Sequence, residues 1–273
     1  MTKKAIFTTS CAKRPDTVLI EFIGLPGSGK STILAALADQ LRKERLRCNT
    51  LRMIARDMME EGRIHIRFLQ RRAERVGIYG CFSFAHEHPA LFDALLHSTR
   101  HDLGRTLWNM DMLAQMHFLS KRPHQDTLVF MDEGFLHRGV SAFTDRPDRA
   151  AFQHYLSCLP YDFITIHVAT PLDVAIARAA ERIKPVPFLG KAAEEAEGMA
   201  NLQEFAALVG IACENRAANG HIVLTVDGTL PTGLAVAQLT GALKALSLPD
   251  IVIPKRAKGT ALAKGMARGK KTA

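Results

Sequence analysis

The sequence has no run of about 18 apolar residues, which is the length that a membrane-spanning helix needs. Its basic N-terminus is not followed by a sustained apolar segment either, so we expect no signal peptide. Internal repeats are also lacking. The 273 residues, of which 47% are hydrophobic, therefore suit one large α/β domain or one domain with an inserted subdomain.

Cysteine is scarce, odd in number and scattered, and no two cysteines form a C-x-x-C pair. The five cysteines are Cys11, Cys48, Cys81, Cys158 and Cys213. This spacing predicts neither a disulfide framework nor a zinc site, and it is typical of reduced thiols in a cytosol. We therefore expect a cytoplasmic protein.

Acidic residues are absent from both ends of the chain, although the whole chain has a net charge of only +9. Residues 1–14 carry four basic residues and residues 251–273 carry seven, so the part between the two ends has a net charge of −2. We interpret residues 1–16 as a flexible leader, 17–250 as the folded domain and 251–273 as a basic flexible tail. A solubilising role is the favoured interpretation of the tail, and contact with nucleic acid or an anionic membrane is the alternative.

The most specific motif of the chain has the pattern G-x-x-x-x-G-K-[S/T]. It consists of Gly24, Leu25, Pro26, Gly27, Ser28, Gly29, Lys30 and Ser31, with Thr32 behind it. An apolar strand-like run precedes the motif and a helical pattern follows it, which is the context of a phosphate-binding loop. Backbone N–H groups of such a loop form a nest for phosphate oxygens, and the following helix adds its positive end. Lys30 can reach the β- and γ-phosphates, and the Ser31 hydroxyl can coordinate Mg²⁺. The stretch resembles the Walker A motif of P-loop nucleoside triphosphatases, which implies binding of ATP or GTP with Mg²⁺.

A second motif ends the apolar run Thr127–Met131 with the acids Asp132 and Glu133. An acid at the end of an apolar strand is the Walker B pattern. Ligands of parallel sheets bind at the carboxyl ends of the strands, so we expect Asp132 to hold Mg²⁺ together with Ser31. Glu133 is the candidate general base or acceptor contact.

Apolar runs and turn residues predict the remaining elements. Strands are expected at 17–23, 47–51, 127–131, 162–169 and 221–228, and helices at about 30–43, 171–182, 191–219 and 231–246. Residues of about 52–123 are mainly helical in pattern and rich in arginine, which we interpret as a helical insertion on the substrate side. The alternative for its arginines is a solvated basic helix face. Apolar residues from Trp108 to Phe118 are predicted to face the core.

Two further basic residues, Arg178 and Arg182, are four positions apart and therefore share one face of a predicted helix. Phosphoryl transfer needs cations that cover the charge spread over the transferring group. Both arginines are therefore candidate catalytic residues. The alternative is a surface helix whose arginines pair with nearby acids.

The order of these motifs over residues 17–247 is similar to that of P-loop kinases of the thymidylate kinase and deoxynucleoside kinase type. The resemblance implies a three-layer α/β fold, with a mainly parallel sheet flanked by helices, and a lid whose arginines contact the phosphates. On this chain the lid arginines correspond to Arg178 and Arg182. These kinases commonly have an Asp-Arg or Glu-Arg pair where this chain has Asp132-Glu133, and whether Arg138 replaces that arginine is left open.

The sequence therefore predicts a Mg²⁺-ATP-dependent phosphotransferase that acts on a small-molecule acceptor, with nucleosides and nucleotides among the candidates. The sequence leaves open whether GTP replaces ATP as the donor. It also leaves open whether the protein forms a homodimer. The alternative is a P-loop ATPase or a nucleotide-binding regulatory protein. A switch GTPase is disfavoured because Asp-x-x-Gly and Asn/Thr-Lys-x-Asp elements are lacking, and a transporter ATPase because no Leu-Ser-Gly-Gly-Gln-like signature is present.

Overall fold

The computed structural model describes residues 17–51, 79–99, 101–121, 127–145, 147–181 and 196–246. Its centre is a sheet of five parallel strands in the order β2-β3-β1-β4-β5. The strands are β1 Thr17–Ile23, β2 Cys48–Thr50, β3 Thr127–Met131, β4 Ile164–Ala169 and β5 Val223–Asp227. The predicted leader, the arginines of 52–75, Arg182 and the basic tail lie outside the described residues.

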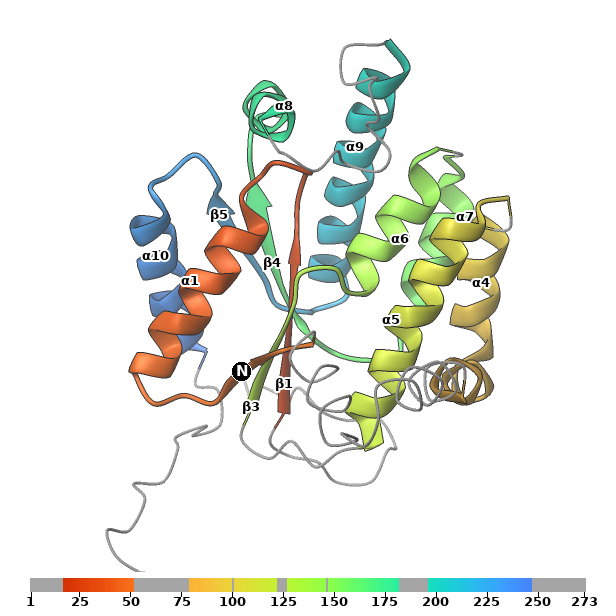
Figure 1. Ribbon diagram of the computed structural model, residues 1–273, viewed down its shortest axis with the longest axis horizontal. Coiled ribbons are helices and arrows are strands. Elements are labelled where there is room, and N and C mark those ends of the chain that lie inside the picture. The colour runs from red at the N-terminus through yellow and green to blue at the C-terminus, as the bar shows by residue number, and fades with distance from the viewer. Residues whose placement is uncertain are drawn as a thin grey trace, which may run out of the picture.

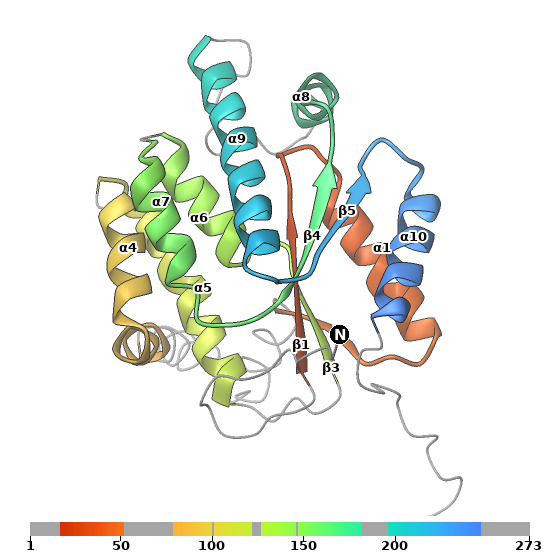
Figure 2. The same cartoon turned by 180° about the vertical axis from the view of Figure 1, so that it is seen from behind.

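Helices cover both faces of the sheet and give the three-layer α/β fold that the sequence predicts (Figures 1 and 2). On one face lie α1 (Lys30–Lys43) and α10 (Thr232–Ala245). On the other face lie α6 (Phe135–Thr144) and α9 (Ala196–Ala218). Beside α6 pack α4 (Pro89–Thr99), α5 (Leu103–Lys121) and α7 (Arg149–Ser157). Helix α8 (Leu172–Ala180) lies beyond the carboxyl end of β4 (Figure 1).

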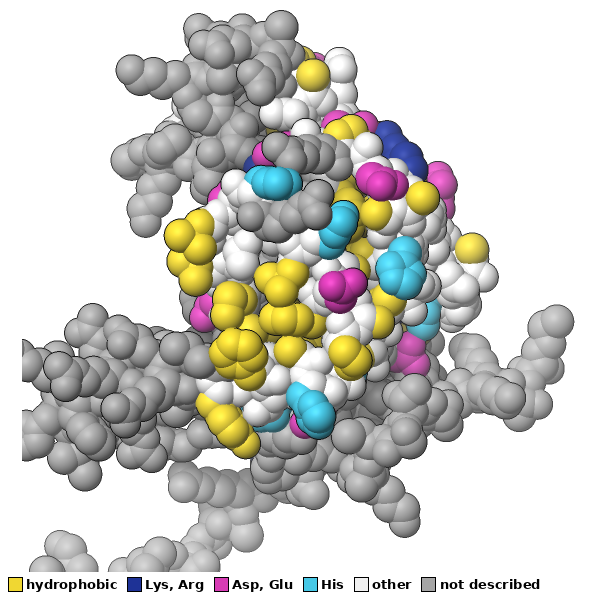
Figure 3. Space-filling model, turned by 90° about the vertical axis from the view of Figure 1, so that its right-hand side faces the viewer, with side chains coloured by type: hydrophobic (Ala, Val, Ile, Leu, Met, Phe, Trp, Pro, Cys, Tyr) yellow, Lys and Arg dark blue, Asp and Glu magenta, His cyan; other side chains and the backbone are white. Residues whose placement is uncertain are grey.

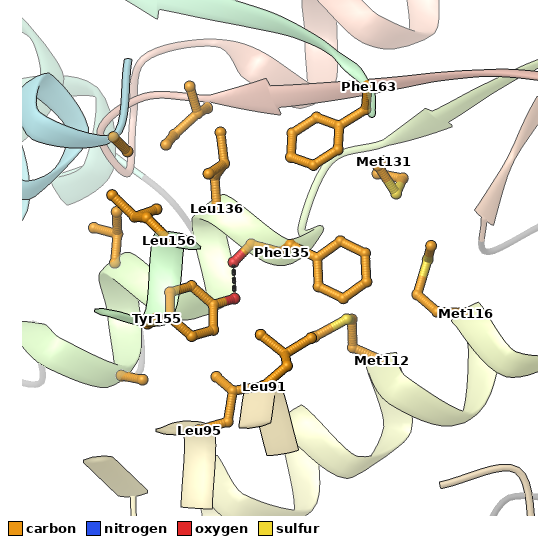
Figure 4. Close-up of a cluster of buried hydrophobic side chains, with 14 of the residues drawn as sticks. Leu91, Leu95, Met112, Met116, Met131, Phe135, Leu136, Tyr155, Leu156 and Phe163 are labelled. Carbon is orange, nitrogen blue, oxygen red and sulfur yellow. Dashed lines mark hydrogen bonds between the residues drawn. The ribbon is translucent and has the colours of Figure 1, made fainter. Parts of the chain in front are cut away.

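The central strands are apolar on both faces because both faces are covered by helices. Val18, Ile20 and Phe22 of β1 pack toward α1 and α10, while Leu19 and Ile23 belong to the core on the opposite side. Figure 4 shows part of this second core, in which Phe135 lies among leucine and methionine side chains of the neighbouring helices. One residue of β1 departs from the apolar pattern: Glu21 is fully buried on the face of α6 and α9.

The predicted boundaries agree closely with the structure where apolar runs are bounded by clear turns. Strands β1 and β3 coincide with the predicted ranges, and α1 ends at Lys43 as expected. The prediction for Trp108 is wrong in one respect, because its side chain is only half-buried, at the margin of the core. Met112, Leu113 and Met116 of the same helix are buried, as predicted.

Apolar side chains also gather on the outer face formed by the helical layer around α4 and α5 (Figure 3). The exposed large apolar residues include Tyr79, Phe82, Leu103 and Leu107. Exposed apolar patches of this kind often mark contact surfaces. The homodimer stays a prediction. None of the helices described here is long and apolar enough to span a bilayer.

Candidate active site

The glycine loop connects the central strand β1 to α1, and at three positions its backbone adopts positive φ values that favour glycine. Gly24, Gly27 and Gly29 have φ values of 151°, 85° and 90°. Lys30 is the first residue of α1, and its side chain is buried. Its Nζ donates hydrogen bonds to the carbonyl oxygens of Gly24 at 2.6 Å and Leu25 at 2.8 Å. The ammonium group of Lys30 is therefore enclosed by the loop that precedes it. A phosphate group bound in this loop would have its negative charge next to that cation.

The loop is held from outside by the connection that follows β4. A Cβ atom at Gly27 would lie 2.1 Å from the carbonyl oxygen of Ala175, so α8 packs directly on the loop and would have to move to admit a side chain at position 27. The hydroxyl of Thr170 donates to the carbonyl oxygen of Ser28 at 3.2 Å. The Oγ atom of Ser28 itself is buried and has no hydrogen-bond partner among the described residues. A bound phosphate oxygen fits such a group, because a buried hydroxyl without a partner is costly.

The acids of the second motif follow β3 at the same edge of the sheet. Met131, the last residue of β3, pairs with Glu21 of β1, so Asp132 and Glu133 leave the sheet beside the start of the loop. Both acids are half-buried. Ser31 and Thr32 are exposed in the first turn of α1.

Arg138, whose part in the motif the sequence left open, pairs with Glu133 although five positions separate the two residues. Its Nη2 lies 3.5 Å from Oε2 of Glu133, and its Nε donates to the backbone oxygen of Glu133 at 3.3 Å. The guanidinium carbon lies 3.3 Å from the centroid of the Trp108 ring. Burial lowers the pKa of Arg138 to about 10, while the charges of nearby carboxylates, that of Glu133 first, oppose the shift. The arginine remains charged at neutral pH.

Two histidines that the sequence did not single out lie near Lys30. His137, in the first turn of α6, is buried between the rings of Trp108 and Phe205. Burial, together with the charges of Lys30 and Arg138, lowers its pKa well below the usual value. His167, near the end of β4, has its pKa lowered by burial and by the charge of Lys30. Both rings are therefore neutral at neutral pH, and no sequence pattern marks either one.

Arg178 connects α8 to the loop after β5. Its Nη1 donates to the carbonyl oxygen of Gly228 at 2.7 Å. The neighbouring Asp227 accepts two hydrogen bonds from Thr229, which lower the pKa of its carboxyl, and the charge of Arg178 acts in the same direction. Arg178 thus lies at the loop's edge of the sheet, while its role at a lid, with Arg182, stays a prediction.

A hollow of about 570 Å³ opens beside the loop, between α9 and the ends of β4 and β5. Leu25, His167, Thr170, Thr225 and Asp227 are among its lining residues. Its volume lies within the range of small-molecule sites.

Within the ranges that the structure describes, no three His, Cys, Asp or Glu side chains gather at a site that could hold a metal ion. Mg²⁺ usually keeps water and phosphate ligands beside one or two protein ligands, so Ser31 and Asp132 are enough for the predicted site.

The order of the sheet, with a glycine loop after its central strand and a buried lysine at the start of the next helix, is the arrangement of the three-layer P-loop α/β fold that the sequence predicts. Among solved structures, a deoxyadenosine kinase from M. mycoides with bound dATP is 16% identical, with a TM-score of 0.46, and the match covers 83% of this chain and 100% of that one. A shikimate kinase from Bacteroides thetaiotaomicron is 13% identical, with a TM-score of 0.37, over 83% of this chain and 98% of the other. No protein-family model and no curated protein matches the chain. These distant likenesses carry no information about the compound on which this chain acts.

Proposed function

We propose that this protein is a Mg²⁺-ATP-dependent phosphotransferase that acts on a small-molecule acceptor. The observation that carries the proposal is the location of two groups at one edge of the sheet. Lys30 is enclosed by the glycine loop after β1, and the paired Glu133 and Arg138 follow the neighbouring strand β3. Phosphoryl transfer needs both kinds of group, because catalysis consists mainly of positioning and of stabilising negative charge.

On the donor side, the loop amides and Lys30 would bind the β- and γ-phosphates. Lys30 would exchange its hydrogen bonds with the carbonyl oxygens of Gly24 and Leu25 for contacts with phosphate oxygens. Ser31 and Asp132 would hold Mg²⁺, which when bound neutralises charge on the phosphate oxygens.

On the acceptor side, Glu133 would orient the acceptor hydroxyl and accept its proton. Arg138 holds the carboxylate of Glu133 and supplies a fixed positive charge beside it. Arg178, bonded to Gly228, would cover the transferring group from the opposite side. A nucleoside or a nucleotide is the first acceptor class to test, because the order of motifs resembles kinases of these compounds.

The test is ADP formation from Mg²⁺-ATP, screened against nucleosides, nucleotides and other small hydroxyl metabolites. We expect one class to stimulate ADP formation by the wild-type protein. Lys30→Ala should lower the stimulated rate by about a hundredfold or more, because a transition-state charge contact is lost. Lys244→Ala is the matched control, because Lys244 is an exposed lysine of α10 that pairs with Glu44 at 2.7 Å, at the end of α1 opposite to Lys30.

If Lys30→Ala leaves ATP affinity and turnover unchanged, the assignment of the loop is wrong. Basal hydrolysis that no acceptor stimulates would favour the alternative of a P-loop ATPase. The same assay with GTP in place of ATP decides the donor.

A further inference from the structure

We propose that Glu21 is a positioning residue of this site. From the strand that leads into the phosphate loop, its carboxylate holds the first turn of α6 and so fixes Glu133 and Arg138 relative to the loop. What Glu133 and Arg138 then do in catalysis rests on the function proposed above.

The first turn of α6 needs an acceptor that its own sequence does not supply. The first N–H groups of any helix have no partner within the helix. Gly134 precedes α6 and provides no side-chain cap. All ten residues of α6 are buried, so water cannot readily replace the missing cap.

Glu21 supplies this acceptor from 116 residues earlier in the chain. Its Oε1 accepts a hydrogen bond from the backbone N–H of His137 at 2.9 Å. A Cβ atom at Gly134 would lie 2.7 Å from the carboxylate carbon of Glu21, so a glycine at 134 is what lets the carboxylate approach the helix. A negative charge also interacts favourably with the positive end of the helix dipole.

The same turn is held on its outer side by a second contact. The hydroxyl of Tyr155, from α7, donates to the carbonyl oxygen of Phe135 at 2.6 Å (Figure 4). The segment that carries Glu133 and Arg138 is therefore fixed between the sheet and the outer helices. Of the two anchors, only Glu21 belongs to the strand that continues into the loop.

The surroundings of Glu21 determine which substitution preserves the contact. Burial raises the pKa of its carboxyl to about 7, against the backbone groups of α6 and the charge of Arg216 from α9. Cys213 of the same helix, Tyr155 of α7 and Arg138 of α6 also face this charge.

The carboxylate Oε2 and the neighbouring Thr165 Oγ1 have no hydrogen-bond partner among the described residues, and the two residues pair in register across β1 and β4. A glutamine at position 21 can keep the acceptor for His137 and offer its amide group to Thr165. A methionine there fills a similar volume without an acceptor.

Trp108 is the only tryptophan of the chain, and Arg138 lies over its ring, so its fluorescence reports the position of α6 without any ligand. We would compare its emission and its quenching by acrylamide in the full chain for the wild type, Glu21→Gln and Glu21→Met. Thr240→Val is the control for removing a buried polar group, because Thr240 lies on α10, across the sheet from α6. ATP affinity and the kinetic constants for the acceptor complete the comparison.

We expect Glu21→Met to change the emission of Trp108 and to lower kcat/KM for the acceptor by about tenfold or more, since a charge-assisted hydrogen bond is lost. The Kd for ATP should stay within about twofold, because the loop itself is unchanged. Glu21→Gln and Thr240→Val should resemble the wild type in every readout.

Wild-type emission from a folded Glu21→Met variant would overturn the proposal, and so would a loss of ATP affinity as large as the loss toward the acceptor. If Glu21→Met does not fold, Glu21→Gln decides. Preserved emission then supports the proposal, and altered emission contradicts it. If no acceptor stimulates the wild type, the proposed function fails, while the emission of Trp108 still tests the role of Glu21.

Discussion

The guanidinium group of Arg138 lies over the indole ring of Trp108, with 3.3 Å between its central carbon and the ring centroid. Trp108 comes from α5 and Arg138 from α6, so the contact joins the outer helical layer to the helix that follows β3. Cation–π contact and the pair with Glu133 together hold the guanidinium in one orientation. The geometry depends on a planar cation, and lysine cannot reproduce it.

Arg138→Lys keeps the positive charge but removes the planar group that covers Trp108 and pairs with Glu133. We expect acceptor-dependent turnover to fall by about tenfold or more, with little change in ATP affinity. The control is Arg149→Lys, because Arg149 is a half-exposed arginine that pairs with Glu204 at 2.8 Å away from the loop. Equal activity of the two variants would contradict the role given to Arg138.

Glu133→Gln removes the charge and the basicity of the candidate general base while its size is kept. General bases contribute about 10²–10⁴-fold in rate, so we expect kcat to fall within that range while binding of ATP and acceptor is retained. Steady-state kinetics together with direct measurement of binding separate the two effects. A retained kcat would remove Glu133 from the chemistry.

Gly27→Ala and Gly29→Ala form a matched pair for the packing of the loop. Both positions have φ near +90°, but a Cβ atom at 27 meets Ala175 at 2.1 Å, whereas one at 29 has no atom within 4 Å. We expect Gly29→Ala to cost about 1 kcal/mol in unfolding free energy from its backbone conformation alone. Gly27→Ala should cost about 1–3 kcal/mol more, because α8 must also move. Denaturant unfolding without nucleotide measures both, and equal losses would show that α8 does not press on the loop.

The pH dependence of stability should carry a contribution from Glu21. Burial raises its pKa from 4.5 to about 7 in the folded state, so between these values the folded protein holds a proton that the unfolded chain has released. The stabilisation is complete below pH 4.5 and is lost as the pH rises through 7.

The measurement is the difference in unfolding free energy between the wild type and Glu21→Gln at several pH values. As the pH rises from 4.5 to above 7, we expect the unfolding free energy of the wild type to fall relative to that of Glu21→Gln by at most about 3 kcal/mol. His137 and His167, whose lowered pKa values act in the opposite direction, are present in both proteins and largely cancel. A difference that is constant with pH would contradict the raised pKa.

Local patterns predicted the elements around the glycine loop well. The loop, the strand before it and the acids after β3 are each encoded in a few consecutive residues, so periodicity and motif spacing locate them. The partners Glu133 and Arg138 were harder to predict, because five residues separate them and only the turn into α6 brings them together.

Contacts between distant segments could not be predicted from the sequence. Glu21 is the one charged residue of a buried strand, and nothing near it in the sequence points to His137, 116 positions later. Trp108 has the same apolar periodicity as its buried neighbours, and only its contact with Arg138 distinguishes it. The lid arginine Arg182 and the arginines of residues 52–75 lie outside the described residues and remain predictions.

The central position of β1 in the sheet also constrains when the protein can fold during its synthesis. Within the described part of the chain, β1 pairs with β3 and β4, whose first residues are 127 and 164. A ribosome that has completed the whole phosphate loop has therefore not yet produced either neighbour of the strand that supports it. Such distant pairings fold slowly and leave an apolar strand exposed during synthesis. We expect nascent chains to acquire nucleotide binding only after Ala169, the end of β4, has emerged.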